Sequence, residues 1–505
     1  MKNILAGTLA SGIALMGCTV MADPDFGSKD HKQYDIGGKI EKIINNQSKN
    51  LFGIKKPLAN PATEADYVPR AQADADERVL LAKGLKATYI TRKVGVSGDM
   101  MTLWPNEKNY THLIVCIEQG RAADGLNAGL QSVDIKTGAI KNILYGMSRC
   151  DGIRTTAWGT VLATEETGDG RAYEIIKPLA TEGHWVADRN TGDIRDGINS
   201  PIPSNNIVQR QALPTMAWEG LTVLASGVVI AGDELRPGSY TDINGSKDTD
   251  GGAIFKFVPD VPFNPALTSS INDLSDSPLA SGDTYAMQVS CVNNKQQTGQ
   301  GCEIGNAAWV GVDPLNARVE ADLNDATGYY RPEDLHMDPT FDGEGVRFCW
   351  ANTGNEGASN FGEVICGIDS DPMLADSDTR SVVVNRFFEG DPRFNSVDNL
   401  AFQPHTGNLY IIEDHKYGEV FACLPDGADR DIKTDGCIGV LSVVDPSAEP
   451  TGFMFDGSGK RAFLIIQHGE QDDSLLDFDS NPVDGRTDDL IMITGFKNRP
   501  QYYHH

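Results

Sequence analysis

The chain lacks an excess of basic residues, because 43 Lys and Arg stand against 71 Asp and Glu and the formal net charge is −28. Binding of nucleic acid through a basic face is therefore excluded. Beyond the N-terminus, the chain also lacks an apolar run long enough to span a bilayer. It contains no nucleophile elbow and no P-loop. An acidic chain without these motifs is suited to holding cations in a cleft.

The N-terminal segment predicts export. Residues 1–22 contain Lys2 followed by a short apolar run that ends in Leu15-Met16-Gly17-Cys18, which is typical of a secretory signal. Leu-x-Gly-Cys resembles a bacterial lipobox, with Cys18 as the lipidated first residue of the mature protein. Ordinary cleavage after Ala22 is the alternative. We expect a periplasmic, outer-membrane or cell-surface lipoprotein, or a freely secreted protein if the lipid is absent.

A repeated hairpin organises the rest of the chain. Each copy begins with a short polar phrase, alternates apolar and polar residues, turns at glycine and ends its second strand in polar residues. Alternation on both sides of a glycine turn predicts a hairpin, and recurrence at intervals of several tens of residues predicts blades. The copies open at Trp218-Glu219-Gly220, Arg331-Pro332-Glu333, Val397-Asp398-Asn399 and Pro450-Thr451-Gly452.

These hairpins predict an all-β fold, a six-bladed β-propeller with loop insertions, over residues 85–500. Residues 23–84 are read as a tether and lead-in segment. Another inner-strand phrase lies at 150–166, where we place a Thr in the opening position. The long interval between Glu219 and Glu333 is interpreted as an insertion plus a degraded unit over 260–330.

Three of the repeated phrases carry a carboxylate, Glu219, Glu333 or Asp398, at the opening position. The innermost strands of a propeller line its central channel, so these side chains are expected to converge. Like charges at short range repel strongly unless they are protonated, separated by water or bridged by cations. Oxygen ligands favour calcium. Any single carboxylate has a solvated structural role as its alternative; three in register indicate a metal site.

The cysteines other than Cys18 suggest disulfides, which export permits. Three pairs are close in sequence: Cys291 with Cys302, Cys349 with Cys366, and Cys423 with Cys437. Two cysteines remain, Cys116 and Cys150. They either form a fourth disulfide with each other or leave a thiolate available as a metal ligand.

Several motifs occur in a fixed order along the chain: Cys150-Asp151-Gly152, Trp158-Gly159-Thr160-Val161-Leu162, Glu165-Glu166, Trp218-Glu219-Gly220, Arg331-Pro332-Glu333, Asp398-Asn399-Leu400-Ala401-Phe402 and Gln467-His468-Gly469-Glu470. Together these stretches resemble the bacterial PhoX-type alkaline phosphatases. The resemblance covers about residues 85 to 475. It implies a six-bladed propeller with two ferric and three calcium ions at the channel mouth, which hydrolyses phosphomonoesters outside the cytoplasm.

The resemblance also implies roles for individual residues. Cys150 would be the thiolate ligand of iron, and Arg331 would point its guanidinium at the substrate phosphate. Glu333 would act in catalysis as well as in metal binding, and Arg331 would share the catalytic role. The remaining metal ligands would be Glu118, Glu166, Glu219 and Asp398, with Glu413 as a further member. The implied cofactors are Ca²⁺ and Fe³⁺, and the implied protein is a monomer that takes small phosphoesters.

The sequence departs from this family at several points. The family's histidines are Ile117 and Trp218 here, and its aromatic residue after Arg-Pro-Glu is Asp334. Lys2 stands in place of a twin-arginine export signal, which implies that metal is loaded after export. Two alternatives stay open: a calcium-only propeller hydrolase of the lactonase type, and a non-catalytic surface lipoprotein whose calcium is structural.

Overall fold

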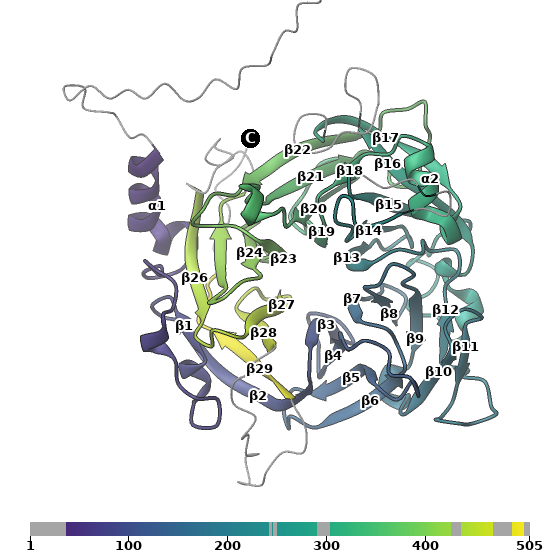
Figure 1. Cartoon of the computed structure of the whole chain (residues 1–505), viewed down its shortest axis with the longest axis horizontal. Coiled ribbons are helices and arrows are strands. Elements are labelled where there is room, and N and C mark those ends of the chain that lie inside the picture. The colour runs from purple at the N-terminus through teal and green to yellow at the C-terminus, as the bar shows by residue number, and fades with distance from the viewer. Residues whose placement is uncertain are drawn as a thin grey trace, which may run out of the picture.

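The computed structural model describes residues 37–241, 245, 250–289, 303–425, 436–467 and 487–498. Its strands form six antiparallel blades in a ring around one axis (Figure 1). We number the blades 1 to 6 by the order of their inner strands. The prediction of an all-β, six-bladed propeller with loop insertions is confirmed. The predicted signal at 1–22, with Cys18, and the Cys291–Cys302 pair lie outside the described residues.

Each blade starts at the axis with an inner strand, and each inner strand contacts the next around the closed ring. The inner strands are β3 (Gly98–Trp104), β7 (Cys150–Thr155), β13 (Trp218–Val223), β19 (Pro332–Met337), β23 (Val397–Phe402) and β27 (Glu449–Phe455). They are followed by the second strands, β4 (His112–Ile117), β8 (Thr160–Glu165), β14 (Val229–Asp233), β20 (Val346–Asn352), β24 (Leu409–Glu413) and β28 (Arg461–Gln467).

The outer half of each blade is built from two more strands. The third strands are β5 (Ala128–Asp134), β9 (Ala172–Ile176), β15 (Gly252–Pro259), β21 (Glu363–Asp369), β25 (Glu419–Cys423) and β29 (Thr487–Thr494). The fourth strands are β6 (Ile140–Tyr145), β12 (Ile207–Gln209), β16 (Gly282–Val289), β22 (Val382–Glu389), β26 (Cys437–Val443) and β2 (Lys86–Gly95). Because β2 precedes blade 1 in the chain but pairs with β29 of blade 6, it closes the ring.

The interval between Glu219 and Glu333 holds one blade rather than two, so the prediction of a degraded unit there is wrong. Its residues form the outer strands of blade 3, with β17 (Gly305–Val312) pairing β16 to β22 of blade 4. The same interval adds helix α2 (Ala317–Leu323) and β18 (Gly328–Tyr329). Blade 1 carries a comparable extension of β10 (His184–Asp188) and β11 (Asp193–Arg195).

The lead-in segment packs on the outside of the ring. Helix α1 (Gly37–Leu51) contacts β26, and β1 (Val79–Leu81) pairs with β26 as a fifth strand of blade 5 (Figure 1). Buried Ile44, Phe52 and Ile54 join the apolar core of this blade. Short 3-10 turns complete the helices: η1 (Glu64–Asp66), η2 (Ala75–Glu77), η3 (Pro178–Ala180), η4 (Leu274–Asp276), η5 (Pro278–Ala280), η6 (Pro314–Asn316) and η7 (Glu356–Ala358).

The same β-bulge interrupts every inner strand near its start. In β13, Trp218 pairs with Asp233 and Leu221 with Ala231, so Glu219 and Gly220 are left outside the ladder. The other five inner strands have the equivalent three-against-two register shift. A bulge bends its strand and re-aims the unpaired side chains. It therefore sets which residue of each inner strand faces the axis.

Side chains tie neighbouring inner strands together beneath these bulges. Asp334 accepts a hydrogen bond from the Leu400 amide at 3.0 Å, and Asn399 accepts one from the Gly452 amide at 2.7 Å. A Cβ on Gly220 would lie 1.9 Å from the Leu335 nitrogen, so only glycine allows blades 3 and 4 to approach this closely. These contacts fix the positions of the bulges relative to one another.

Two of the described disulfides join directly opposed residues of neighbouring strands. The predicted pairs Cys349–Cys366, between β20 and β21, and Cys423–Cys437, between β25 and β26, are confirmed. A third disulfide, Cys116–Cys150, links blade 1 to blade 2. In the part of the chain that the structure describes, no helix has the length and apolar character needed to cross a membrane.

Candidate metal centre

An acidic cavity of about 410 Å³ opens where the inner strands begin. Among its described lining residues are nine carboxylates, two arginines and a serine, and neither His nor Cys contributes to the lining. The lining residues are Ser97, Asp99, Glu118, Arg149, Asp151, Glu166, Glu219, Arg331, Glu333, Asp398, Asp414 and Glu449. The three carboxylates that the repeated phrase predicted, Glu219, Glu333 and Asp398, do come together here.

A first ring of carboxylates comes from the bulges. The first unpaired residue of the bulge is acidic in five of the six blades, and is Gly452 in blade 6. Equivalent register places the five acids at one level around the axis: Asp99, Asp151, Glu219, Glu333 and Asp398. Asp99 and Asp151 were not predicted. The Thr assigned to the opening of the 150–166 phrase was wrong, since Asp151 takes that position.

A second ring follows the second strands. In five blades, the amide of the residue after the second strand donates to the carbonyl of the residue before the inner strand; in blade 2, for example, Glu166 N lies 2.7 Å from Arg149 O. The residues held in this way are Glu118, Glu166, Glu234, Thr353 and Asp414. The predictions of Glu118 and Glu166 at the cavity therefore agree with the geometry.

Glu413 does not reach the cavity. Because side chains alternate along a strand, it points away from the axis and is fully buried. Its carboxylate accepts hydrogen bonds from the Asn395 and Glu419 amides and pairs with His415 at 3.2 Å. The sequence interpretation was one residue out of register, because Asp414 is the acidic residue of blade 5 that lines the cavity.

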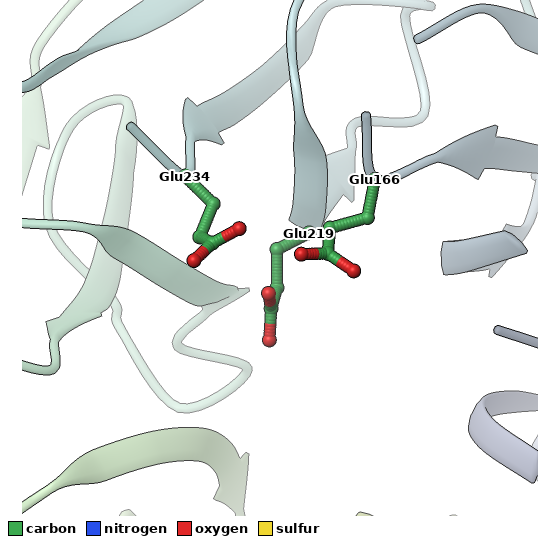
Figure 2. A group of neighbouring side chains, drawn as sticks. All are labelled: Glu166, Glu219 and Glu234. Atoms are coloured by element: carbon green, nitrogen blue, oxygen red, sulfur yellow. The ribbon is translucent and has the colours of Figure 1, made fainter. Parts of the chain in front are cut away.

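Glu219 belongs to two groups of potential ligands. One group combines it with Glu166 and Glu234, and the other with Glu333 and Asp398; in each, three carboxylate oxygens lie within 4.8 Å of one another. Figure 2 shows the first group, in which Glu166 and Glu234 approach Glu219 from neighbouring segments. An oxygen cluster of this spacing matches what a hard cation requires, and a shared carboxylate allows two cations to sit side by side.

The electrostatics of the cavity indicate uncompensated negative charge. Burial and the charges of neighbouring carboxylates raise the pKa of Asp99 to about 8 and hold the pKa values of Asp151, Glu219 and Asp398 well above their ordinary range. Burial, followed by the charge of Glu234, raises the pKa of Glu333 to about 7. Such groups stay ionised at neutral pH only if positive charge is supplied.

One buried carboxylate oxygen in this cavity, Asp151 Oδ1, has no hydrogen-bond partner among the described residues. Asp151 is 2% exposed. An unsatisfied buried carboxylate oxygen is costly, so it points to a missing positive partner. Together with the two ligand groups around Glu219, this oxygen shows that the residues present fit calcium.

Two arginines supply the positive side chains of the described cavity lining. Arg331 pairs with Glu234 at 2.6 Å and with Glu333 at 2.9 Å. Arg149 pairs with Glu166 at 2.7 Å and also with Glu118. Arg331, a predicted site residue, lines this cavity, and its contact with a substrate phosphate stays a prediction; Arg149, which also lines it, was not predicted. Arg149 could have been found from its position in the sequence, because it directly precedes an inner-strand phrase, as Arg331 does.

The assignment of Cys150 as a thiolate ligand is wrong. Its Sγ lies 2.08 Å from Cys116 Sγ in a disulfide whose two residues are fully buried, and it is absent from the cavity lining. A disulfide sulfur is not a thiolate and does not replace one as a ligand. The alternative pairing of Cys116 with Cys150 is confirmed. The described donor set consists of oxygen atoms, so it does not fit iron held by a thiolate.

Comparisons with known proteins support the fold. No family model matches the sequence, and no curated protein matches it. PhoX of Pseudomonas fluorescens, solved with vanadate as a transition-state analogue, superposes with a TM-score of 0.56 at 16% identity over 86% of this chain and 98% of that chain. This similarity shows a shared propeller fold, and at this identity it assigns no residue a role.

Two other solved structures are more distant. A gluconolactonase from Xanthomonas campestris is 12% identical with a TM-score of 0.41, over 87% of this chain and 97% of that chain. Regucalcin from Agrobacterium tumefaciens, a calcium-binding protein, is 12% identical with a TM-score of 0.37, over 82% of this chain and 98% of that chain.

Proposed function

We propose that this protein is a calcium-dependent phosphomonoesterase, a PhoX-like alkaline phosphatase without thiolate-ligated iron. The observation that carries the proposal is the cavity itself, where nine carboxylates and two arginines of the described residues meet at one end of the channel. Carboxylates alone would be sufficient to bind a cation with a purely structural role. Arginines beside them add donors suited to a phosphoryl group, because the planar guanidinium matches phosphate oxygens.

The cations would be held by the two groups that share Glu219, with Asp151 as a further ligand. Bound calcium would supply positive charge that polarises a phosphoryl oxygen and lowers the pKa of a water molecule. Arg331 would orient the phosphoryl group and stabilise charge as it shifts to the leaving group. Glu333 contacts both Arg331 and Thr353, so it fixes the guanidinium while it contributes to cation binding.

A calcium-dependent lactonase is the second candidate. It is favoured by the oxygen-only donor set of the described cavity lining, since a lactonase-type centre needs no iron and no cysteine ligand. The two arginines distinguish the candidates, because a neutral lactone gives a guanidinium no anionic partner. A non-catalytic calcium protein of the cell surface would show calcium-dependent stability without turnover of either substrate class.

The test is hydrolysis of p-nitrophenyl phosphate by the calcium-loaded protein, repeated after EGTA treatment and with Glu333→Gln. We expect turnover that EGTA abolishes, and a loss of about 100-fold or more in Glu333→Gln, since both arginine orientation and cation binding depend on this group. Absence of turnover with calcium present would exclude the phosphatase. Turnover of a lactone by the same sample would assign the second candidate.

We further propose that the protein is exported as a monomer and anchored by a lipid at Cys18. The proposal is supported by the signal-like run and by Leu15-Met16-Gly17-Cys18. Detergent phase partitioning of the native protein tests it, with Cys18→Ala as the comparison. The native protein should enter the detergent phase and the variant should not; equal partitioning would contradict lipidation. Sedimentation of the detergent-free protein should give the mass of one chain.

A further inference from the structure

Arg149 and Arg331 occupy the same structural position in different blades. Each directly precedes its inner strand, β7 or β19, and each accepts at its carbonyl oxygen from the residue after the second strand, Glu166 or Thr353. In the other blades with this hydrogen bond, the equivalent residues are Ser97, Ala217 and Ser396. An arginine is therefore not required to build this part of the blade.

Both arginines adopt a backbone conformation that residues other than glycine seldom use. The φ angles are 54° at Arg149 and 56° at Arg331, in the left-handed region. Ser97 and Ser396 share it, with φ of 61° and 50°. This conformation is unfavourable for a non-glycine residue, and such positions cluster at functional sites. Three of these four residues, Ser97, Arg149 and Arg331, line the acidic cavity.

The side-chain contacts of the two arginines are alike. Arg149 uses Nε and Nη2 on Glu166, and Nη2 on Glu118. Arg331 uses Nε on Glu234, and Nη2 on Glu333. Within the described residues, neither Nη1 has a hydrogen-bond partner. Each guanidinium is thus fixed by carboxylates on one edge and keeps one amino group for a further acceptor.

The two ion-paired groups also lie close to each other. Glu166, held by Arg149, and Glu234, held by Arg331, have carboxylate oxygens within 4.8 Å of each other and of Glu219. This pair bridges the boundary between blades 2 and 3. Each guanidinium therefore contacts a different member of the first ligand group around Glu219.

From this arrangement we propose that Arg149 is a second substrate-binding residue, which forms with Arg331 a two-arginine clamp selective for phosphomonoesters over phosphodiesters. The proposal rests on the proposed phosphatase function. A phosphomonoester has three terminal oxygens and up to two negative charges, so one oxygen on the cations leaves two for the arginines. A diester has two terminal oxygens and one charge, so it engages only one of the guanidinium groups.

The chain itself offers a conservative replacement for Arg149. Serine holds the same position with the same backbone conformation in blades 1 and 5, so Arg149→Ser removes the guanidinium without demanding a new backbone. Arg149→Lys is the second variant, because it keeps the charge but loses the planar fork. Arg195→Ser is the matched control: Arg195 pairs with Asp193 in β11, at the outer edge of blade 1.

The experiment measures kcat/KM of the calcium-loaded protein on p-nitrophenyl phosphate and on bis(p-nitrophenyl) phosphate. For Arg149→Ser we expect a loss of about 10- to 100-fold on the monoester, the effect of a lost charge-assisted hydrogen bond, and a change below about threefold on the diester. Arg149→Lys should lie between this variant and the native protein, and Arg195→Ser should match the native protein.

Several results would overturn the proposal. One is an equal effect of Arg149→Ser on both substrates, or no effect on either. Another is uptake of an additional calcium ion by this variant with unchanged kcat/KM, which would make Arg149 only a counter-ion of Glu118 and Glu166. If the native protein hydrolyses neither ester, the proposed function is wrong. Calorimetric measurement of inorganic phosphate binding then tests whether the two arginines form an anion clamp. Binding that disappears in Arg149→Ser supports the clamp; equal binding in both proteins, or none, contradicts it.

Discussion

Carboxylate oxygens of Glu166 and Glu234 lie within 4.8 Å of each other across the boundary between blades 2 and 3. Two buried carboxylates this close repel each other unless one carries a proton or a cation lies between them. Burial raises the pKa of Glu166 to about 7 and that of Glu234 to about 8, in spite of the arginine beside each. Without cations, these carboxyl groups therefore bind protons at neutral pH. Bound calcium would displace those protons.

The first prediction concerns pH and calcium. Because the cavity carboxyls bind protons more tightly in the folded chain than at their ordinary pKa of 4.5, stability of the calcium-free protein should fall as pH rises from about 4.5 to 8. Calcium at about 100 times its dissociation constant adds about 2.7 kcal/mol. The melting temperature in EGTA should therefore drop between pH 5 and pH 8, and calcium should restore more of it at pH 8.

His415 provides the necessary control for that measurement. Its pairing with Glu413 raises its pKa to about 9, so its stabilisation is complete below its ordinary 6.5 and disappears as pH rises through 9. This loss of stabilisation overlaps the upper part of the pH range in which the cavity carboxyl groups lose their protons. His415→Gln removes the contribution, and the calcium-dependent difference should remain. A melting temperature that does not change on addition of calcium at any pH would contradict the cation site.

The second prediction concerns Glu219, which is shared by both ligand groups. Glu219→Gln should weaken calcium binding by about tenfold or more, because it removes a charged ligand. In EGTA, the same variant should melt higher than the native protein, since it removes a buried carboxyl group that must either take up a proton or stay charged among like charges when the chain folds. Calorimetric titration tests the lower calcium affinity, and thermal unfolding in EGTA tests the higher melting temperature. Glu182→Gln, on an exposed residue paired with Lys141, is the matched control.

The third prediction concerns the disulfide. Cys116→Ser and Cys150→Ser should have the same effect, a loss of about 2–4 kcal/mol of unfolding free energy with calcium content unchanged, because each breaks the same bond. Denaturant unfolding and elemental analysis provide the comparison. Loss of bound metal in Cys150→Ser but not in Cys116→Ser would instead restore Cys150 as a ligand.

The fourth prediction concerns Asp151, the buried carboxylate with an unpartnered Oδ1. Asp151→Asn should lower calcium affinity about as much as Glu219→Gln, and should lower kcat on p-nitrophenyl phosphate by about tenfold or more. Asp193→Asn on the outer strand β11 should change neither quantity. Native calcium affinity in the Asp151→Asn protein would exclude Asp151 as a ligand of the metal centre.

The repeated phrase was enough to predict the propeller and much of the site. Glu219, Glu333 and Asp398 follow an apolar residue or Pro at the start of alternating strands, and that pattern survives in the sequence because the bulge recurs at the same place. The same rule, applied to Cys150-Asp151-Gly152, selects Asp151. The family resemblance drew attention to the cysteine next to it instead.

The remaining errors have identifiable physical causes. A shift of one residue along a strand reverses the direction of the side chain, which is why Glu413 was chosen in place of Asp414. Asp99 was missed because Gly98-Asp99 lacks the apolar residue that precedes the other acids. The choice between a Cys116–Cys150 disulfide and a free thiolate depends on the packing of β4 against β7, which connects different blades and leaves no local signal.

Elemental analysis of the protein purified from its native exported form tests the central claim most directly. Because Glu219 joins two separate ligand groups, the account predicts at least two calcium ions per chain and no iron that depends on Cys150. A protein that carries less than one bound metal ion per chain, yet remains folded and active, would contradict it.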